Sequence, residues 1–558
     1  MSDLPKPRRS EERPWMKMWP KEVPAHLEYP EETLADLLSK MARKQPEAVQ
    51  FVFMGREITF HETDSVVDRL ASSFQRLGLK KGGRVALVLP NCPQFAFSYY
   101  ATLRAGGVVV PVNPLYTEGE LKAELVDSGA ELVVALDIFY DMVARAAKGT
   151  EVRHVVATNV ADYMPPLKAR LGRLLGKVPS AGVPADAGRF GRLVAEGGSP
   201  ERVAVDVYRD PAIFMYTGGT TGTPKAAMLS NMNLVSNCIM VTVWGGLSSE
   251  DCVLAAIPWF HVYGMTVALN ASITAGLKVV ALPRFSVKDT FEAVRRYRPT
   301  TFPGVFSMYI ALMASPLFRE YKAEFGRLRS CLSGAAPLPI EVAKSWTEAT
   351  GSLLAEGYGL SEASPVTHAN PLRDNSKVRL GSIGFPMPDT DARVVDMQTG
   401  KELGPGEHGE LIIKGPQVGL GYWNRKEDTE ATFRDGWLHT GDIAYMDEDG
   451  YFYIVDRKKD MINVGGLKVW PREVEEVAYG HEAVRMAAAV GVHDDFHGES
   501  PKLFVVLKEG YRGKVSEADM ISFMKGKLAP YKVPKFVEFK DELPTTLVGK
   551  VLRRKLRE

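Results

Sequence analysis

The sequence predicts a mixed α/β protein, with a large N-terminal domain of layered α/β subdomains plus a small β-barrel, followed by a small mobile α+β C-terminal domain. Three observations carry this prediction. Strand-like apolar runs alternate with helical periods to about residue 365, short apolar runs between turn residues follow Pro371, and a further unit begins at Arg457. A chain of 558 residues, 45% of them hydrophobic, is long enough for more than one packed core.

The N-terminal part repeats one local order, which is apolar strand, helical period, turn and apolar strand. This order is typical of a parallel sheet with crossover helices. It occurs in GRVALVLPNCPQFAFSYYATLRAGGVVVPVNP (83–114), GLKVVALPRFSVKDTFEAVRRYRPTTFPGV (276–305) and LRSCLSGAAPLPIEVAKSWTEATGSLLAEGYG (328–359). We therefore expect layered α/β structure from about residue 50 to 365.

The segment 371–456 has a different texture and predicts a β-rich subdomain within an N-terminal domain of residues 1–456. Its stretch DARVVDMQTGKELGPGEHGELIIKGP alternates short apolar runs with turn residues, which suits antiparallel hairpins or a small barrel. We assign residues 457–558 to the C-terminal α+β domain. There Pro471 opens an acidic helix, and Ser516 with Asp519 predicts a capping box for a helix through Leu528.

Composition excludes several classes of partner. Lysine and arginine total 69 and aspartate and glutamate 68, so no global field draws the protein to nucleic acid or to an anionic membrane. The four cysteines, Cys92, Cys238, Cys252 and Cys331, form no CxxC pair, which argues against a zinc site or a disulfide framework. The N-terminus lacks the apolar core of a signal peptide, so we expect a cytoplasmic protein.

Two segments raise the question of a membrane. Cys252 to Leu277 has no charged side chain and is long enough to span a bilayer, but Pro258, His261, Gly264 and Asn270 interrupt it. Buried strand and helix separated by a turn explain it better. The cluster Trp15, Met16, Met18 and Trp19 either packs on the body or rests weakly on a membrane surface, and packing is favoured.

The stretch YTGGTTGTPKAAMLSNMN (216–233) carries the most specific signal in the chain. Backbone N–H groups of a glycine-rich loop, threonine hydroxyls and the cation of Lys225 suit a phosphate. A Walker A loop is excluded, because Thr223 and Pro224 separate Gly222 from the lysine. Ser230 or Asn231 would cap the following helix. The alternative is a surface turn without function.

This loop resembles the phosphate loop of the AMP-forming acyl-CoA synthetases, the adenylate-forming superfamily, with Ala226 in place of the usual glycine. Further signatures of that family follow in order: PWFHVYG (258–264), SGAAPL (333–338), EGYGLSE (356–362), GWLHTGD (436–442), DRKKDMINVGG (456–466) and LPTTLVGKVLRR (543–554). The resemblance thus covers nearly the whole chain.

The resemblance implies an enzyme that uses ATP, Mg²⁺ and CoA. A carboxylate attacks the α-phosphate of ATP, and a thiol then displaces AMP from the acyl-adenylate. Lys550 matches the catalytic lysine of the first step, Glu362 with Thr217 the position that directs the metal, and His261 a position near the substrate carboxylate. The matching nucleotide-binding positions are Thr217, Gly218, Gly219, Thr220, Thr221, Gly222, Thr223, Lys225, Gly334, Ala335, Ala336, Glu356, Gly357, Tyr358, Gly359, Ser361, Asp442, Ile454, Arg457, Lys459, Gly465, Gly466 and Lys550.

The resemblance also implies a specific role for several of these residues. Asp442 would accept hydrogen bonds from the ribose hydroxyls, because a carboxylate offers acceptors only. Lys459 matches the hinge about which the small domain turns, and Gly465 and Gly466 would line the path of CoA after that turn. Each residue also has an alternative without function. Asp442 could simply end a turn, and Lys459 could lie in an exposed charged linker. The two glycines could form a plain hairpin turn, and Lys550 could belong to a basic C-terminal tail.

The pattern of matches is most similar to fatty acid–CoA ligases for medium to long chains, with an aryl-CoA ligase (4-coumarate- or benzoate-like) or another adenylate-forming enzyme as the alternative. A kinase, which would release ADP, and a protein that binds nucleotide without turnover are the competing classes. We expect small-molecule partners only, namely fatty acid, ATP and CoA. A homodimer and a peripheral membrane contact are left open.

Overall fold

The strand–helix–strand stretches of the sequence fold into two large mixed sheets. The computed structural model describes residues 13–185, 187–217, 224–546 and 549–557. One sheet has the strand order β16 (Phe385–Pro386), β15 (Val366–Ala369), β14 (Leu354–Gly359), β13 (Ser330–Ser333), β12 (Thr301–Gly304), β10 (Cys252–Ala255), β11 (Lys278–Ala281), β1 (Val49–Phe53) and β2 (Arg56–Thr59).

The second large sheet contains the strand that leads into the loop at 218–223, which lies outside the described residues. Its order is β19 (Gly421–Tyr422), β9 (Lys225–Ser230), β8 (Pro211–Thr217), β4 (Val108–Pro111), β3 (Arg84–Val88), β5 (Leu132–Leu136), β6 (His154–Thr158) and β7 (Gly188–Arg189).

The predicted crossovers are confirmed. Strands β3 and β4 are parallel and joined by α3 (Pro93–Arg104), and β13 and β14 are parallel and joined by α14 (Ile340–Thr350). Helix α11 (Val287–Tyr297) connects β11 to β12, but β10 lies between these two strands in the sheet. A continuous apolar core joins both sheets through Phe51, Val85, Phe95 and Leu234.

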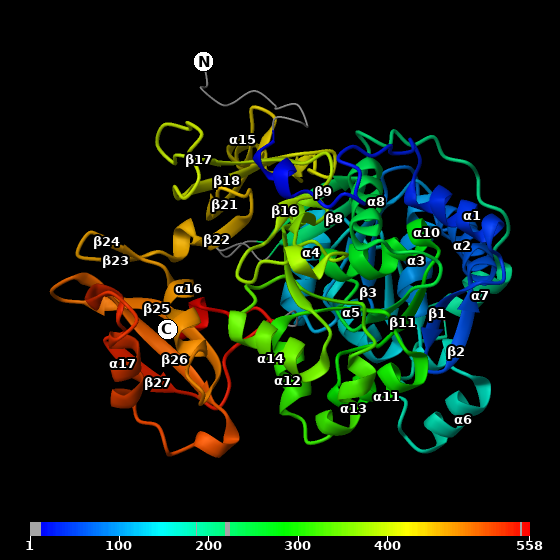
Figure 1. Cartoon of the computed structure of the whole chain (residues 1–558). Helices are drawn as coiled ribbons and strands as arrows, with labels where there is room; N and C mark the ends of the chain where they lie inside the picture. Colours follow the sequence, from blue (N-terminus) through cyan, green and yellow to red (C-terminus); the bar gives the residue numbers. More distant parts are fainter. Residues whose placement is uncertain (1–12, 186, 218–223, 547–548, 558) are drawn as a thin grey trace.

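Most of the remaining helices of the large body pack against or between these sheets, whereas α15 (Lys426–Thr432) lies with the β-rich segment described below (Figure 1). The others are α1 (Leu34–Lys44), α2 (Phe60–Arg76), α4 (Glu118–Ser128), α5 (Tyr140–Ala146), α6 (Pro166–Leu174), α7 (Phe190–Glu196), α8 (Asn231–Gly245), α9 (Val262–Gly264), α10 (Ala271–Ala275), α12 (Phe306–Ala314) and α13 (Phe318–Phe325). Ser230 is the cap of α8, since its side chain accepts from the backbone N–H of Asn233 while Asn233 accepts in return.

The charge-free stretch 252–277 is buried strand and helix, as predicted. It forms β10, α9, a π-helical segment Met265–Asn270 and α10. No helix within the described part of the chain is long and apolar enough to cross a bilayer. The tryptophans near the N-terminus pack on the body, because Trp15 is buried against Phe452 and Trp19 against Trp244.

The segment after Pro371 forms the predicted antiparallel hairpins. Its sheet contains β17 (Asp391–Val395), β18 (Gly409–Lys414), β20 (Phe433–Arg434), β21 (Trp437–Met446) and β22 (Phe452–Arg457), and the long strand β21 pairs with β18, β20 and β22. The segment is less separate than its sequence suggests. Strands β16 and β19 leave it to join the two large sheets, antiparallel to β15 and β9.

The C-terminal part has its own sheet and its own core, and in Figure 1 it lies beside the large body. It contains β23 (Ile462–Val464), β24 (Leu467–Val469), β25 (Val484–Asp494), β26 (Gly498–Leu507), β27 (Phe536–Phe539), α16 (Pro471–Tyr479), α17 (Glu517–Lys525) and α18 (Arg554–Arg557).

The helix start and the capping box predicted in this part are confirmed. Pro471 is at the start of α16, and Ser516 and Asp519 form the capping box of α17. Helix α17 ends at Lys525 rather than Leu528, because Gly526, a weak helix former, follows as its C-cap.

Candidate functional site

A cavity of about 1520 Å³ lies where the large sheets, the β17–β22 sheet and the C-terminal part meet. Its lining brings together most of the predicted residues, although they come from distant segments of the chain. They are Thr217, Lys225, His261, Gly334, Ala335, Ala336, Glu356, Gly357, Tyr358, Gly359, Ser361, Glu362, Asp442, Ile454, Arg457, Lys459 and Lys550.

The other eight predicted residues fall into two groups. Gly218, Gly219, Thr220, Thr221, Gly222 and Thr223 lie outside the described residues. Gly465 and Gly466 form the turn between β23 and β24, with φ of +57° and +90°. This is the plain hairpin turn that was the alternative to a functional role for the two glycines. Their predicted contact with CoA therefore stays a prediction.

The turn after β13 brings backbone to the cavity wall. A side chain at Gly334 would place its Cβ 3.0 Å from the ring of Tyr263, which is closer than nearly all Cβ contacts, so glycine relieves crowding at this point. The next residue, Ala335, has a φ of +66°, a left-handed conformation that is costly for alanine. Strained backbone of this kind is typical of functional sites.

Asp442 is held by two donors. The hydroxyl of Tyr358 donates to its Oδ2 at 2.5 Å, and Nε of Arg457 lies 3.3 Å from its Oδ1. Pairing of β21 with β22 puts Asp442 directly opposite Arg457. Burial raises the pKa of Asp442, and the positive charge of Arg457 opposes this shift. Each carboxylate oxygen has a second lone pair, so Asp442 retains capacity to accept from a ligand.

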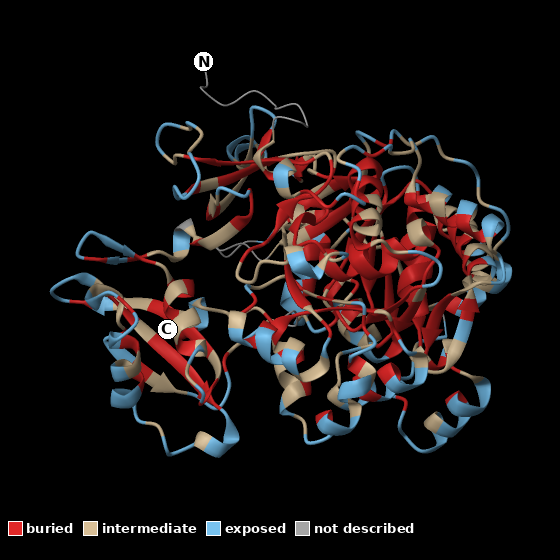
Figure 2. Ribbon diagram, in the orientation of Figure 1, coloured by how far each residue is buried: buried red, intermediate tan, exposed pale blue. Residues whose placement is uncertain are grey.

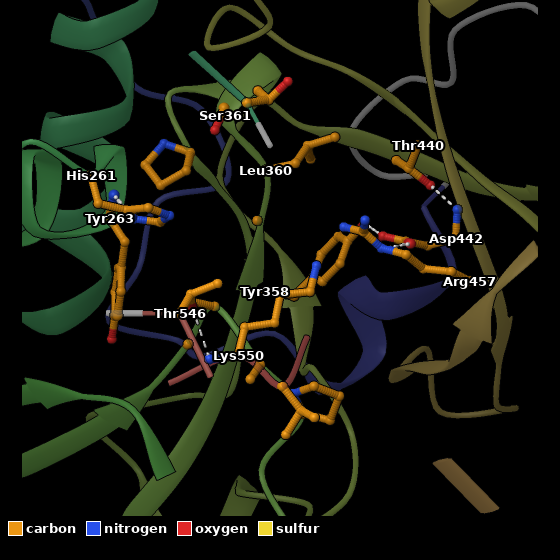
Figure 3. A pocket seen from close by; sticks show the side chains of 18 of the residues that line it. His261, Tyr263, Tyr358, Leu360, Ser361, Thr440, Asp442, Arg457, Thr546 and Lys550 are labelled. Carbon is orange, nitrogen blue, oxygen red and sulfur yellow. Dashed lines mark hydrogen bonds and ion pairs between the residues drawn. The ribbon is translucent and has the colours of Figure 1, made fainter. Parts of the chain in front are cut away.

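Lys550 reaches the cavity from a tight turn of the C-terminal part. Its backbone N–H donates to Oγ1 of Thr546 at 3.1 Å, and its carbonyl accepts from the backbone N–H of Thr546 at 2.8 Å. Burial lowers the pKa of Lys550 to about 8, helped by Arg457 and opposed by Asp442. Figure 3 shows Lys550 beside Tyr358, with His261 on one side and Asp442 and Arg457 on the other.

Gly549 explains how this turn fits against the large body. Its φ is +71°, and a Cβ at this position would lie 2.4 Å from Oγ of Ser307 and 2.9 Å from Cγ2 of Val305. No larger residue fits such a contact without displacement. The glycine before the lysine thus permits close approach of the turn to the large body.

His261 marks an apolar end of the cavity. Its Nδ1 accepts from the backbone N–H of Tyr263 at 3.2 Å and so caps α9. Burial, together with the nearby charge of Lys550, lowers the pKa of His261 to about 4. The imidazole is therefore neutral at physiological pH. The neighbouring wall is apolar or aromatic and comes from Phe260, Val262, Tyr263 and Phe306.

Tyr422 and Asp428, which belong to none of the sequence motifs, contact the residues predicted to bind metal and phosphate. The hydroxyl of Tyr422, on β19, donates to Oε1 of Glu362 at 2.6 Å. Asp428, on α15, forms an ion pair with Nζ of Lys225, which also lies 5.7 Å from the centre of the Tyr422 ring. Oγ1 of Thr217 donates to the carbonyl of Lys225 at 3.3 Å.

The carboxylate of Glu362 suits a metal ion that is held mainly by the phosphates of a bound nucleotide. Within the described part of the chain there is no cluster of three or more His, Cys, Asp or Glu side chains that would cage an ion. A lone carboxylate such as Glu362 fits Mg²⁺, which commonly keeps waters and phosphate oxygens as its other ligands. When bound, such an ion neutralises phosphate charge.

Glu356 has an unexpected contact. Its Oε2 lies 3.2 Å from Nη2 of Arg472, on α16, and both side chains are buried. Arg472 also donates to the carbonyl of Ile454 at 2.8 Å. Burial raises the pKa of Glu356 to about 7, and Arg472 opposes the shift. The Glu356 side chain thus joins the large body to the C-terminal part, and its predicted contact with nucleotide stays a prediction.

Comparisons with known proteins agree with this geometry. Residues 38–423 match the family of AMP-binding enzymes, and residues 473–550 match the AMP-binding enzyme C-terminal domain. A long-chain-fatty-acid–CoA ligase of Bacillus subtilis (strain 168) is 43% identical over 555 residues, which is 98% of each chain. A feruloyl-CoA synthase of Amycolatopsis sp is 36% identical over 518 residues, covering 93% of this chain and 97% of the relative.

A solved structure has the same fold. ATP-bound MatB from Rhodopseudomonas palustris superposes with a TM-score of 0.82 at 31% identity, covering 94% of this chain and 98% of that chain.

Proposed function

The chain belongs to the AMP-binding enzyme family, and from this premise we propose that it is an AMP-forming fatty acid–CoA ligase, an acid–thiol ligase. It activates a fatty acid with ATP and transfers the acyl group to CoA. The names of the relatives support this substrate class, since a relative that matches along 98% of its own length is a long-chain-fatty-acid–CoA ligase.

The observation that carries the proposal is the convergence of distant groups on the same cavity. Thr217, Lys225, Glu362, Asp442 and Lys550 all line it, and Lys550 enters from the C-terminal part. A carboxylate and a triphosphate are both anions and repel each other, so their reaction needs cations placed between them. Lys550, Arg457 and Lys225 supply such charges.

The proposed reaction has two steps. A carboxylate oxygen of the fatty acid forms a bond to the α-phosphorus of ATP, and the bond to pyrophosphate breaks. The thiol of CoA then forms a bond to the acyl carbon, the bond to AMP oxygen breaks, and the thiol proton passes to solvent. In the first step Lys550 holds positive charge beside the reacting oxygens, Asp442 orients the ribose, and His261 lies near the carboxylate end of the acyl site.

We propose that residues 1–456 and 457–558 are domains that move relative to each other about Lys459. Two observations support this. Lys550 lines the cavity, whereas Gly465 and Gly466 lie in a hairpin turn away from it. A turn of the C-terminal domain would exchange these two faces between the first step and the second.

The test is identification of the products with a panel of carboxylic acids from acetate and aryl acids to long-chain fatty acids. We expect AMP and pyrophosphate, formed fastest with a medium- or long-chain fatty acid. Fastest turnover of an aryl acid would support the alternative aryl-CoA ligase, and release of ADP would contradict the proposal. A cytoplasmic location and a homodimer are further parts of this proposal, and gel filtration tests the second.

A further inference from the structure

Helix α6 exposes an unusual amount of apolar surface. Leu167, Leu171, Leu174 and Leu175 are 81%, 54%, 81% and 57% exposed, so one nine-residue helix and the residue after it hold a third of the twelve large hydrophobic side chains exposed within the described residues. The helix lies at the edge of the molecule in Figure 1, and Figure 2 shows it largely exposed. Exposed apolar side chains gathered in this way usually mark an interaction site.

The leucines lie on the outer face of the helix. Their positions i, i+4, i+7 and i+8 share one side of an α-helix. Ala169, which is buried, lies on the opposite side, where the helix packs on the body. Helices on the surface of a globular protein normally turn their apolar stripe inward, and this one turns its leucines to solvent.

Cations flank the leucine stripe. Between Pro165 and Ser180 the chain has Lys168, Arg170, Arg173 and Lys177 and no acidic residue, although the whole chain carries a net charge of only +1. Lys168 donates to the carbonyl of Met54 at 2.9 Å, and Arg173 forms an exposed ion pair with Asp162. Among the described residues no hydrogen bond or ion pair involves the side chains of Arg170 and Lys177.

The apolar surface continues beside the helix. A groove of about 370 Å³ runs between α6 and the turn of β1 and β2, lined by Met54, Gly55, Pro165, Leu167, Leu171 and Arg296. The groove adds a further cation, Arg296, at its edge. Leucines and cations therefore occupy the same face.

We propose that α6 docks the protein on the surface of an anionic lipid bilayer, with its leucines among the acyl chains and its cations at the headgroup phosphates. A helix with an apolar stripe between cations fits this boundary, where apolar interior and negative charge lie within one side-chain length. A second copy fits less well, because a symmetric contact through α6 would bring two sets of cations together. A contact through so short a helix is weak and reversible. This proposal goes beyond the proposed catalytic function and does not rest on it.

Sedimentation of the full chain with vesicles tests the proposal. We expect binding to vesicles of phosphatidylcholine mixed with phosphatidylglycerol, and much weaker binding to phosphatidylcholine alone or at high salt. Leu167→Ser, Leu171→Ser and Leu174→Ser combined should weaken binding by at least about 10-fold. Each serine reduces the apolar area that is removed from water when the helix binds the bilayer. The matched control is Leu317→Ser, an exposed leucine at the start of α13, which should bind like the original protein.

A second pair of variants isolates the charges. Arg170→Gln with Lys177→Gln should lower binding to the anionic vesicles only, and Lys288→Gln, an exposed lysine of α11, should not. Fluorescence of Leu171→Trp should shift to shorter wavelength on the anionic vesicles, which reports insertion even if the serine variant folds poorly. Unchanged binding of the serine variant, no shift for the tryptophan, or a dimer that the leucine substitutions dissociate would each overturn the proposal.

Discussion

Nη2 of Arg553 lies 2.9 Å from both carboxylate oxygens of Glu475. Nη1 of the same guanidinium lies 3.0 Å from Oδ1 of Asp456, at the end of β22. Arg553 is three residues beyond Lys550, so these ion pairs tie the turn that carries Lys550 to the segment where the large body passes into the C-terminal part. Arg553 is therefore a positioning residue for Lys550.

Arg553→Ala should slow adenylation by about 10-fold or more, because a lysine that is no longer held spends less time at the reacting atoms. Thioester formation from supplied acyl-adenylate should change little. Single-turnover assays of each step measure this, with Arg512→Ala, an exposed arginine paired with Asp541, as the control. Partial rescue by Arg553→Lys is expected, and an equal loss in both steps would point to a general structural defect.

Lys550→Ala should slow adenylation by roughly 10²-fold or more, since it removes a charge that stabilises the transition state. The second step should again be spared. Release of pyrophosphate and consumption of supplied acyl-adenylate, followed separately, give the two rates. If both steps are impaired equally, the assignment of Lys550 to the first step is wrong.

Gly549→Ala should impair adenylation through a steric clash, because its Cβ would lie 2.4 Å from Ser307. Gly513→Ala is the matched control: Gly513 has a similar φ of +72°, but no other group lies within 4 Å of the place that a Cβ would take there. Both variants carry the backbone strain, and only Gly549→Ala carries the clash. Equal adenylation rates for the two variants would refute the close approach as the reason for glycine.

Asp428→Asn should lower KM for ATP by roughly 2- to 5-fold with little change in kcat, because ATP phosphates then need not displace a partly exposed ion-pair partner from Lys225. Steady-state kinetics at varied ATP measure this. Glu430→Gln, on the same helix, is the control. A higher KM for Asp428→Asn would show that the carboxylate helps to position Lys225.

Glu124→Gln should make stability less dependent on pH. Glu124 is buried on α4 and its Oε1 has no hydrogen-bond partner among the described residues. Burial, together with the negative charge of Asp127, raises its pKa from 4.5 to about 8. The unfolded chain releases this proton near pH 4.5 while the folded protein retains it, so stability falls as pH rises from 4.5 through 8.

The neutral glutamine removes that loss. Between about pH 4.5 and 8 the variant should gain stability relative to the original protein, on the order of a few kcal/mol at the upper end. Denaturant unfolding at several pH values measures the difference. A difference that is constant with pH would mean that Glu124 does not titrate in this range.

Local features of the fold were predictable from the sequence. The caps at Ser230 and Ser516 and the start of α16 at Pro471 depend on hydrogen bonds and backbone angles within four residues. The crossovers β3–α3–β4 and β13–α14–β14 also follow from apolar periodicity along short segments. The gathering of Glu362, Asp442 and Lys550 was anticipated through the resemblance to a family, whose motifs stand far apart in the chain.

Other contacts were decided by tertiary structure alone. Strands β16 and β19 have the same sequence texture as the rest of the β-rich segment, yet each pairs with a strand of a large sheet. Glu356 meets Arg472, 116 residues away, and Lys225 meets Asp428, 203 residues away.

The sequence by itself thus determined the local elements, their caps and the identity of the chemical groups, because these depend on a few consecutive residues. Only the tertiary structure decided which cation faces which carboxylate and which strand completes which sheet. The physical reason is that an ion pair or a sheet edge is satisfied by whichever partner packing brings within a few ångströms, and no local pattern records that choice.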